Sequence, residues 1–400
     1  MKKLKALFLI PIILLLLACQ SGDKSETIKV QNQTDAFLKD VFIIKTLNTD
    51  LKNFILKDGE TEIPFQIIND EGLKIGFVLD LAANEEKTLT LVPVENKKEY
   101  KTRTYAELSM KQGNIYYDGR FRGDKFENVT KIKVPSIHTD HDALFRYEGP
   151  GWESELVGYR FYLDWRNATD IFGKKVNELL LHNVGIHDTV AKDDSYHSMQ
   201  EWGMDIFKVG SSLGIGSVAL WQNGKVNMVS KTDSVYCEIR ENGPVRSRIK
   251  TNYFGWLIGE NKYDLECDFS ITAGSRLTKV DLHIKDADSL ATGLAKYKGT
   301  NFIKSKIEGE WSYIALYGSQ TLVNETDKLG IAIFYKTSSI LQLTEDELSH
   351  ILVLKPENDK AEYYFCAAWE QEPNGVTNEA DFINYLNITQ IELNNPPLIK

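Results

Sequence analysis

Cysteine is scarce in this sequence, with only four in 400 residues. The first, Cys19, ends an apolar N-terminal run, which leaves Cys237, Cys267 and Cys366 for the folded protein. Their spacing matches no zinc motif, and an odd number argues against a fold that depends on disulfides. A disulfide between Cys237 and Cys267 is compatible with neighbouring strands, but we favour buried free thiols.

Basic residues are outnumbered, with 47 Lys and Arg against 57 Asp and Glu and a formal net charge of −10. This excess of acid disfavours nucleic acid and an anionic membrane surface as partners. An acidic sugar is not excluded, because a local cluster of Arg and His can bind an anion inside an acidic protein. Beyond the N-terminus, no run is long and apolar enough to cross a bilayer.

Several signatures of nucleotide and hydrolase chemistry are missing. The glycine-rich run 210–216 lacks the P-loop lysine and follows no βα pattern, which argues against a phosphate cradle. A Gly-x-Ser-x-Gly nucleophile elbow is also absent. No cofactor is therefore expected.

The N-terminus has the pattern of a bacterial lipoprotein. Three lysines among the first five residues precede an apolar stretch over 7–17, and Leu16-Leu17-Ala18-Cys19 reads as a lipobox. The apolar stretch is too short for a permanent transmembrane helix. We expect residues 1–18 to be a signal peptide and 19–26 a tether. The chain would be lipid-anchored at Cys19, on the periplasmic or the outer face of the outer membrane, because Gln20 is not the aspartate that retains lipoproteins at the inner membrane.

Strand signals dominate the rest of the chain and predict a mostly β protein. Short runs separated by Asn-Asp and Asp-Gly turns predict a small N-terminal β-sandwich over 27–100. Residues 101–137 are polar and irregular and are interpreted as a connector. Longer strands follow, including a hairpin around Asn223-Gly224, so 138–400 is predicted to form large stacked antiparallel sheets.

Helix signals are few. A Thr-x-x-Glu capping box predicts a short helix over Thr344–His350. A second helix is predicted over Ala380–Leu393.

Chemistry concentrates in residues 138–208, which contain five of the seven histidines. Histidine exchanges protons near neutral pH, so this clustering is the main functional signal. Arg146, Arg160 and Arg166 lie in the same segment. Trp152 is there too and could stack on a sugar ring, although burial in a core is the commoner role of tryptophan.

The stretch 158–166 has the composition of a strand, in which alternate residues share a face. One face would carry Tyr159, Phe161, Leu163 and Trp165 into the core. The other would carry four polar residues, and this face is either a solvated surface or the lining of a polar cleft. Neighbouring aromatic and glycine-rich sequence favours the cleft. The polar residues are Arg160, Tyr162, Asp164 and Arg166.

A second polar group follows at irregular spacing, which indicates a loop. Its members are His182, His187, Asp188, Asp193, Asp194 and His197. The run from His138 to Asp142 is similar. Four His and several Asp are compatible with zinc or calcium, but no known ligand spacing is present, so a bound metal is left open.

The runs 138–166 and 194–210 resemble a family of Bacteroidetes lipoproteins that carries the label of a domain of unknown function. The resemblance covers most of the chain after the signal peptide and is densest over 138–255. It implies a galactose-mutarotase-like β-supersandwich and a place among polysaccharide-degrading enzymes. One branch resembles an oligosaccharide dehydratase of ulvan breakdown, which removes water from a uronic acid at the non-reducing end and leaves a 4,5-unsaturated sugar.

Such a reaction requires a cation for the carboxylate, a base for the C5 proton and an acid for the leaving oxygen. We predict Arg160 as the carboxylate clamp, with Tyr162 and His197 sharing the acid and base roles. Two alternatives stay open: a non-catalytic oligosaccharide-binding lipoprotein, and an epimerase or mutarotase that needs no carboxylate clamp. The substrate-binding residues are predicted to be His138, His141, Arg146, Trp152, Arg166 and Lys208.

Overall fold

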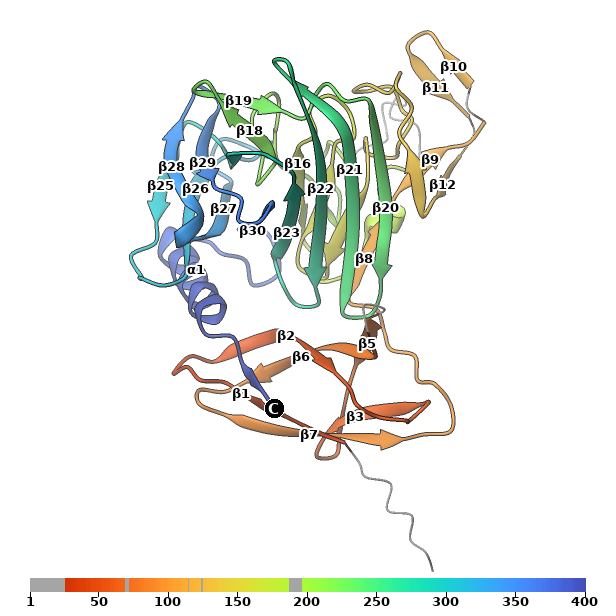
Figure 1. Ribbon diagram of the computed structural model, residues 1–400, viewed down its shortest axis with the longest axis vertical. Coiled ribbons are helices and arrows are strands. Elements are labelled where there is room, and N and C mark those ends of the chain that lie inside the picture. Colours follow the sequence, from red (N-terminus) through yellow and green to blue (C-terminus); the bar gives the residue numbers. More distant parts are fainter. Residues whose placement is uncertain (1–25, 69–71, 114, 124, 187–195) are drawn as a thin grey trace, which may run out of the picture.

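The computed structural model describes residues 26–68, 72–113, 115–123, 125–186 and 196–400. Within these ranges the strands form seven sheets and there is a single α-helix, which confirms the mostly β class (Figure 1). No helix among the described residues is both long and apolar enough to span a bilayer.

The N-terminal unit consists of two sheets packed face to face around an apolar core. The first has the order β31-β1-β7-β3-β4, with bounds Leu398–Ile399, Thr27–Gln31, Glu86–Pro93, Phe54–Asp58 and Thr61–Ile63. The second has the order β2-β6-β5, with bounds Leu38–Thr46, Lys74–Leu81 and Phe65–Ile68. Alternate apolar residues such as Ile28, Val30, Leu89 and Leu91 are fully buried between them. The predicted division at residue 100 omitted β31, which returns from the far end of the sequence and pairs with β1.

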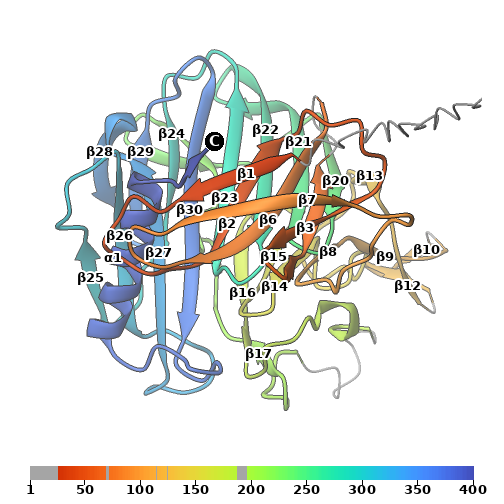
Figure 2. The ribbon, with the colours of Figure 1, turned by 90° about the horizontal axis from the view of Figure 1, so that it is seen from below.

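A nine-stranded antiparallel sheet forms the wall of the large unit. Its order is β13-β20-β21-β22-β23-β30-β27-β26-β25, with bounds Lys131–Lys133, Ser234–Asn242, Arg246–Ile258, Asn261–Thr272, Leu277–Ile284, Lys360–Trp369, Lys328–Lys336, Trp311–Ser319 and Thr300–Lys304. In Figure 2, which is seen from below, the N-terminal strands lie in front of the long strands of this sheet and cross them.

Two five-stranded sheets share the main apolar core with this wall. One has the order β17-β16-β15-β14-β8, with bounds Gly203–Asp205, Thr169–Lys174, Gly158–Phe161, Gly151–Ser154 and Thr104–Glu107. The other has the order β19-β18-β24-β29-β28, with bounds Lys225–Met228, Ala219–Gln222, Leu290–Ala295, Ser349–Leu354 and Ile340–Glu345. Two short 3₁₀-helices, Leu181–Asn183 and Thr337–Ser339, connect strands.

The predicted connector over 101–137 is built largely of strands. β8 completes the sheet of β14–β17, and β13 forms the edge of the nine-stranded sheet. Two small ribbons project from the body beside them (Figure 1). They pair β9 with β12 and β10 with β11, with bounds Ser109–Lys111, Phe126–Asn128, Ile115–Tyr117 and Arg120–Arg122. Runs of three or four residues are too short for alternation to identify as strands.

Turn and helix predictions made from a few adjacent residues were confirmed where long-range contacts stabilise the same conformation. The hairpin between β18 and β19 turns at Asn223 and Gly224, both at positive φ, as this type of turn requires. The C-terminal helix is confirmed as α1, Glu379–Asn394, and the Asn378 side chain caps it by accepting from Asp381 N. This helix packs on β26 and β27, where Phe382 and Leu386 are buried.

The helix predicted over Thr344–His350 is wrong. These residues end β28, turn, and begin β29. The Asp346 carboxylate accepts from the backbone N–H groups of Leu348 and Ser349 at 2.8 and 2.7 Å. A capping box stabilises a seven-residue helix only weakly, and the ladder between two long-range strands outweighs it.

The three described cysteines are free and buried, as favoured from the sequence. In the nine-stranded sheet, Thr251 on β21 pairs with Cys237 on one side and Cys267 on the other, so an intervening strand separates these two thiols. Burial raises the pKa of each thiol, which keeps it protonated.

We expect Cys237, Cys267 and Cys366 to resist alkylation in the native protein and to react fully once it is unfolded, because only the exposed thiolate is nucleophilic. Peptide mapping after labelling in buffer and in denaturant measures this. A Cys237–Cys267 disulfide would leave both residues unlabelled in denaturant without reductant.

Candidate active site

Three neighbouring strands bring opposite charges together on one sheet face. Arg160 on β15 is directly opposite Asp170 on β16, and Asp205 on β17 is opposite Phe172, two residues further along β16. Because side chains two residues apart share a face of a strand, all three charged groups meet. Arg160, Asp170 and Asp205 are at most 2% exposed.

The Arg160 guanidinium is the centre of this charged cluster. Its Nε and Nη2 donate to Asp170 Oδ2 at 3.0 and 2.7 Å. Its Nη2 also reaches Asp205 Oδ2 at 2.6 Å and Tyr162 Oη at 2.9 Å, and its Nη1 donates to Tyr196 Oη at 3.3 Å. Tyr162 Oη in turn donates to Asp170. A buried charge is tolerated only when it is paired and hydrogen-bonded, and this network meets that condition.

The two sides of the cluster differ in ionisation. Burial, together with the nearby charge of Asp205, raises the pKa of Asp170 to about 7, although Arg160 opposes the shift. Burial also acts to raise the pKa of Glu148, but Arg160 and Arg166 outweigh it and the pKa is lowered. The cluster therefore contains Asp170, whose carboxyl group can hold a proton near neutral pH, and Glu148, whose carboxylate stays ionised.

A pocket of about 220 Å³ opens beside the cluster. The imidazole of His197 lines it and is 52% exposed. His197 Nδ1 lies 3.2 Å from Asp205 Oδ2, and the ring centroid is 4.2 Å from that of Tyr196. Asp205 thus orients the imidazole and leaves Nε2 for proton exchange with a ligand. The pocket is lined by Arg120, Phe126, His141, Ala143, Phe145, Arg146, Tyr147, Glu148, Gly185, Tyr196 and His197.

Arg146 forms another wall of this pocket and is 6% exposed. Its Nη2 contacts Glu107, and its Nη1 donates to the carbonyl of His182 at 3.0 Å. Its Nε is buried and has no hydrogen-bond partner in the described part of the chain. Arg146 therefore brings a guanidinium group to the lining of the pocket, and such a group suits an anionic ligand.

The loop that carries these walls has an unusual backbone. His141, Ala143, Tyr147 and Glu148 have φ between 58° and 70°, a region that non-glycine residues rarely adopt. Each such residue costs about 1–3 kcal/mol, so surrounding contacts must hold the loop. One is close backbone packing at Gly149, where a Cβ atom would lie 1.9 Å from the Phe161 carbonyl oxygen. Strain held beside a pocket is typical of functional loops.

The structure brings several predicted residues together. Some of them line the pocket, and others are not part of its lining. His141 lines it, is 74% exposed, and places Nδ1 3.3 Å from Glu148 Oε1. Arg166 pairs with Glu148 at 2.9 Å and stacks 3.7 Å above the centre of the Tyr162 ring. Arg160 and Tyr162 lie outside the pocket wall, and the Arg160 donors are already used by side chains. The structure therefore does not place Arg160 and Tyr162 in the pocket lining, and their direct roles at a substrate stay predictions.

Other predicted residues are elsewhere. Trp152 is 1% exposed and donates to Thr278 Oγ1 at 2.8 Å, so it belongs to the core and not to a sugar platform. His138 is buried, with Nδ1 2.8 Å from Asp142 Oδ2. Lys208 is exposed and does not line the pocket. Trp165, predicted in the core, is 45% exposed, because β15 ends at Phe161 and the alternation stops there.

The metal interpretation depended partly on residues that lie outside the described ranges: His187, Asp188, Asp193 and Asp194. Among the residues that the structure describes, no three His, Cys, Asp or Glu side chains are grouped as metal ligands.

Sequence reasoning missed Asp170, Asp205, Glu148 and Tyr196. One signal was available, because Asp170 interrupts the otherwise uncharged run Thr169–Gly173, and an acid inside a buried strand needs a partner. The partnership itself depends on strand register, which the sequence does not reveal.

The chain is similar to several known proteins. An uncharacterized protein, P7, of Formosa agariphila is 25% identical over 333 residues, which cover 80% of this chain and 76% of that protein. A protein in the glycosyl hydrolase family 38 and an alpha-mannosidase, both from Enterococcus faecalis, align with TM-scores of 0.47 and 0.46 at 8% and 9% identity. The alignments cover 94% of this chain but only 47% and 46% of those structures, so the chain spans about half their length.

The family model described as "Domain of unknown function (DUF4861)" matches residues 36–399. That range includes nearly all of both units and every described residue of the candidate site. The chain therefore belongs to the DUF4861 family.

Proposed function

We propose that this protein is a carbohydrate-active lyase that removes water from a uronic acid at the non-reducing end of an oligosaccharide of the ulvan type. The observation that carries the proposal is the presence, in the lining of one small pocket, of an Asp-oriented His197 and of Arg146. The first supplies proton transfer and the second supplies charge for a carboxylate. In this proposal the pocket of about 220 Å³ takes a single terminal sugar unit.

The reaction needs two proton transfers at neighbouring carbons. A base removes the C5 proton, which is α to the carboxylate, and the electron pair of the C5–H bond becomes the C4–C5 double bond. The C4–O bond breaks, and an acid protonates the departing hydroxyl so that it leaves as water. The carboxylate must be neutralised, because negative charge develops on it when C5 loses its proton.

Each role can be assigned to a pocket residue. Arg146 holds the carboxylate. It takes the role that was predicted from the sequence for Arg160. His197 and Tyr196 both line the pocket, and they take the proton-transfer roles in either order. Arg160 and Tyr162 act from behind, because Arg160 binds Tyr196 Oη and Asp205, which in turn holds His197.

The test is incubation with uronate-terminated oligosaccharides and with matched neutral ones, followed by absorbance of the unsaturated uronate and mass analysis. Loss of one water from the uronate substrate alone supports the proposal. Binding without any mass change would identify a sugar-binding protein, and conversion to an isomer of equal mass would identify an epimerase or mutarotase.

We further propose that the protein is lipid-anchored at Cys19 in the outer membrane, on the lipobox argument, since these residues lie outside the described ranges. Replacing Cys19 by alanine is expected to abolish lipidation and leave the precursor unprocessed, because the thiol is the acceptor of the lipid. Fatty-acid labelling and membrane fractionation measure this. Normal labelling of Cys19→Ala would contradict the assignment.

A further inference from the structure

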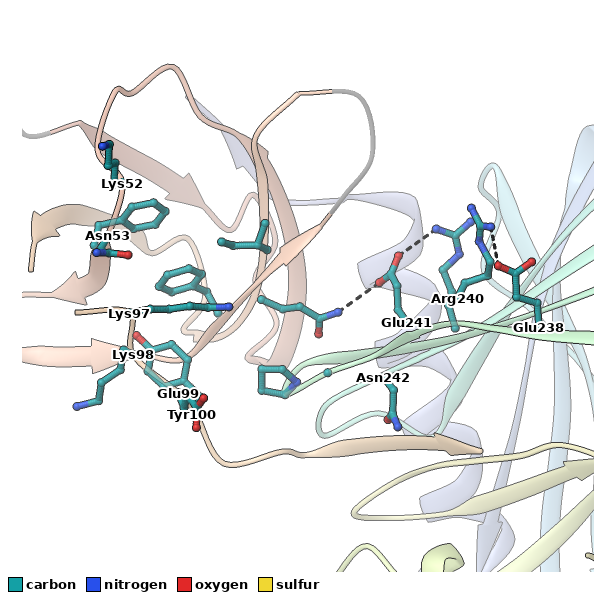
Figure 3. A pocket seen from close by; sticks show the side chains of 17 residues that line it. Lys52, Asn53, Lys97, Lys98, Glu99, Tyr100, Glu238, Arg240, Glu241 and Asn242 are labelled. Carbon is teal, nitrogen blue, oxygen red and sulfur yellow. Dashed lines mark hydrogen bonds and ion pairs between the residues drawn. The ribbon is translucent and has the colours of Figure 1, made fainter. Parts of the chain in front are cut away.

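A cavity larger than the pocket at His197 lies away from the candidate active site, between the N-terminal unit and the large unit. It has a volume of about 790 Å³, against about 220 Å³ for the pocket at His197, and the two share no lining residue. We call it the interdomain cleft. Figure 3 shows Lys52, Lys97 and Tyr100 on its N-terminal side, and Arg240 and Glu241 on the side of the large unit.

The two walls of the interdomain cleft are fixed relative to one another. Gln66 on β5 accepts from the backbone N–H of Arg246 at 3.0 Å and donates to Glu241 at 3.3 Å. Arg103 joins Asp40 of the N-terminal unit to Glu155 of the large unit at 2.9 and 2.6 Å. The cleft is therefore a formed feature of the fold, and a ligand would not have to create it.

The charge of the cleft is opposite to that of the whole chain. Five basic side chains line it, against three carboxylates, in a protein whose formal net charge is −10. The basic residues are Lys52, Lys97, Lys98, Arg240 and Arg248, and the acidic residues are Glu99, Glu238 and Glu241.

Two of these carboxylates are already neutralised inside the wall. Glu241 pairs with both Arg246 and Arg248, at 2.6 and 3.1 Å, and Glu238 pairs with Arg240 at 3.0 Å. On the opposite wall Lys52 and Lys97 are exposed, and neither forms an ion pair with any residue that the structure describes. Set against Glu99, the remaining lining carboxylate, these two lysines leave a small excess of positive charge for a ligand.

The cleft also offers aromatic surface. The rings of Phe54 and Phe65 stack with centroids 5.1 Å apart, and Tyr100 lies 5.5 Å from Phe65. Phe65 and Tyr100 are half-buried and line the cleft, so part of each ring is presented to it. Aromatic surface beside cationic groups suits a sugar chain that carries acidic substituents, because the rings pack on its apolar C–H faces while the lysines meet its charge.

We propose that the interdomain cleft binds a segment of anionic polysaccharide, as a second carbohydrate site separate from the pocket at His197. The choice of a uronate polymer as ligand depends on the proposed function, whereas the preference for an anionic chain depends only on the cleft. Its volume accommodates several sugar units, so the cleft would hold the protein on a polymer while the small pocket takes one terminal unit.

The test is titration calorimetry of the full-length protein with an oligoglucuronate and with a neutral oligoglucoside of equal length. The double variant Lys52→Glu/Lys97→Glu is expected to bind the oligoglucuronate about tenfold more weakly or worse, because two attractive charges become repulsive. The wild type is expected to prefer the oligoglucuronate, with an affinity that falls as salt is added.

The matched control is Lys231→Glu/Lys285→Glu, which changes the net charge equally. These lysines are exposed near Leu257 and Ile284, at the end of the nine-stranded sheet opposite the cleft. Equal loss of affinity in both double variants, or none in the cleft variant, would overturn the proposal. So would tighter binding of the neutral oligosaccharide, or of a single-stranded oligonucleotide, than of the oligoglucuronate.

His197→Ala separates this inference from the proposed function. We expect it to lose turnover and to keep the affinity for the cleft-length oligoglucuronate. If no turnover is found for any uronate substrate but the cleft variant still loses affinity selectively, the dehydratase proposal fails and the cleft proposal stands. If His197→Ala abolishes binding of the long oligomer, the cleft is not an independent site.

Discussion

Replacing His197 by alanine is expected to lower turnover of a uronate-terminated oligosaccharide by at least about 10²-fold, the lower limit for loss of one general acid or base. The imidazole is half-exposed and contributes little to the core, so the melting temperature should change little. Steady-state kinetics and thermal unfolding of the same preparations measure both quantities.

The matched control is His283→Ala, at an exposed position of β23, where the strand alternates buried and exposed residues. We expect wild-type turnover and stability for it. Wild-type turnover in His197→Ala would remove this residue from the mechanism. A large loss of melting temperature with unchanged turnover would instead give His197 a structural role.

Replacing Arg160 by methionine is expected to destabilise the protein by about 3–5 kcal/mol, the usual cost of removing one partner from a buried ion pair. Methionine retains much of the side-chain volume, but Asp170 and Asp205 would then share a buried site without their counter-ion. Urea unfolding measures the free energy of unfolding of both proteins. A loss below about 1 kcal/mol, as for a surface pair, would contradict the network as described.

The same variant has a diagnostic pH dependence. Without Arg160, which opposes the shift, burial and the nearby Asp205 hold the folded-state pKa of Asp170 above its unfolded value, so the folded protein binds more protons than the unfolded one. The contribution of Asp170 to stability is then complete below its unfolded pKa, near 4, and is lost as the pH rises through its folded pKa. The deficit of Arg160→Met relative to wild type should therefore shrink as the pH falls from 8 to 5. Adding Asp205→Asn should restore part of the stability at the higher pH.

The parts of the fold that were predictable are those in which a few adjacent residues decide the conformation. The dipeptide Asn223-Gly224 specifies the turn between β18 and β19. The sequence over Ala380–Leu393 indicated a helix, and α1 forms there. The segment Thr344–His350 failed because pairing of β28 with β29 overrides a local cap signal. β31 was unpredictable for a similar reason, since a two-residue strand exists only through its long-range partner β1.

For the candidate site, the clustering of histidines pointed to the correct region, and alternation placed Arg160 and Tyr162 on one face. The depth of each side chain could not be read from the sequence. Tyr162 is buried and does not line the pocket, and Trp152 is in the core. Asp170 and Asp205 gain their importance only from the registers that set β16 beside β15 and β17.

The pairing of β31 with β1 has a consequence for how the protein is made. Residues 27–31 leave the ribosome early, but the strand that completes their sheet on one side is translated only after the whole large unit. Until then β1 has an open edge, which is a template for pairing with other chains. The N-terminal sandwich therefore reaches its final form only when the C-terminal strand is available, and a chain truncated before Leu398 would keep an unprotected β edge.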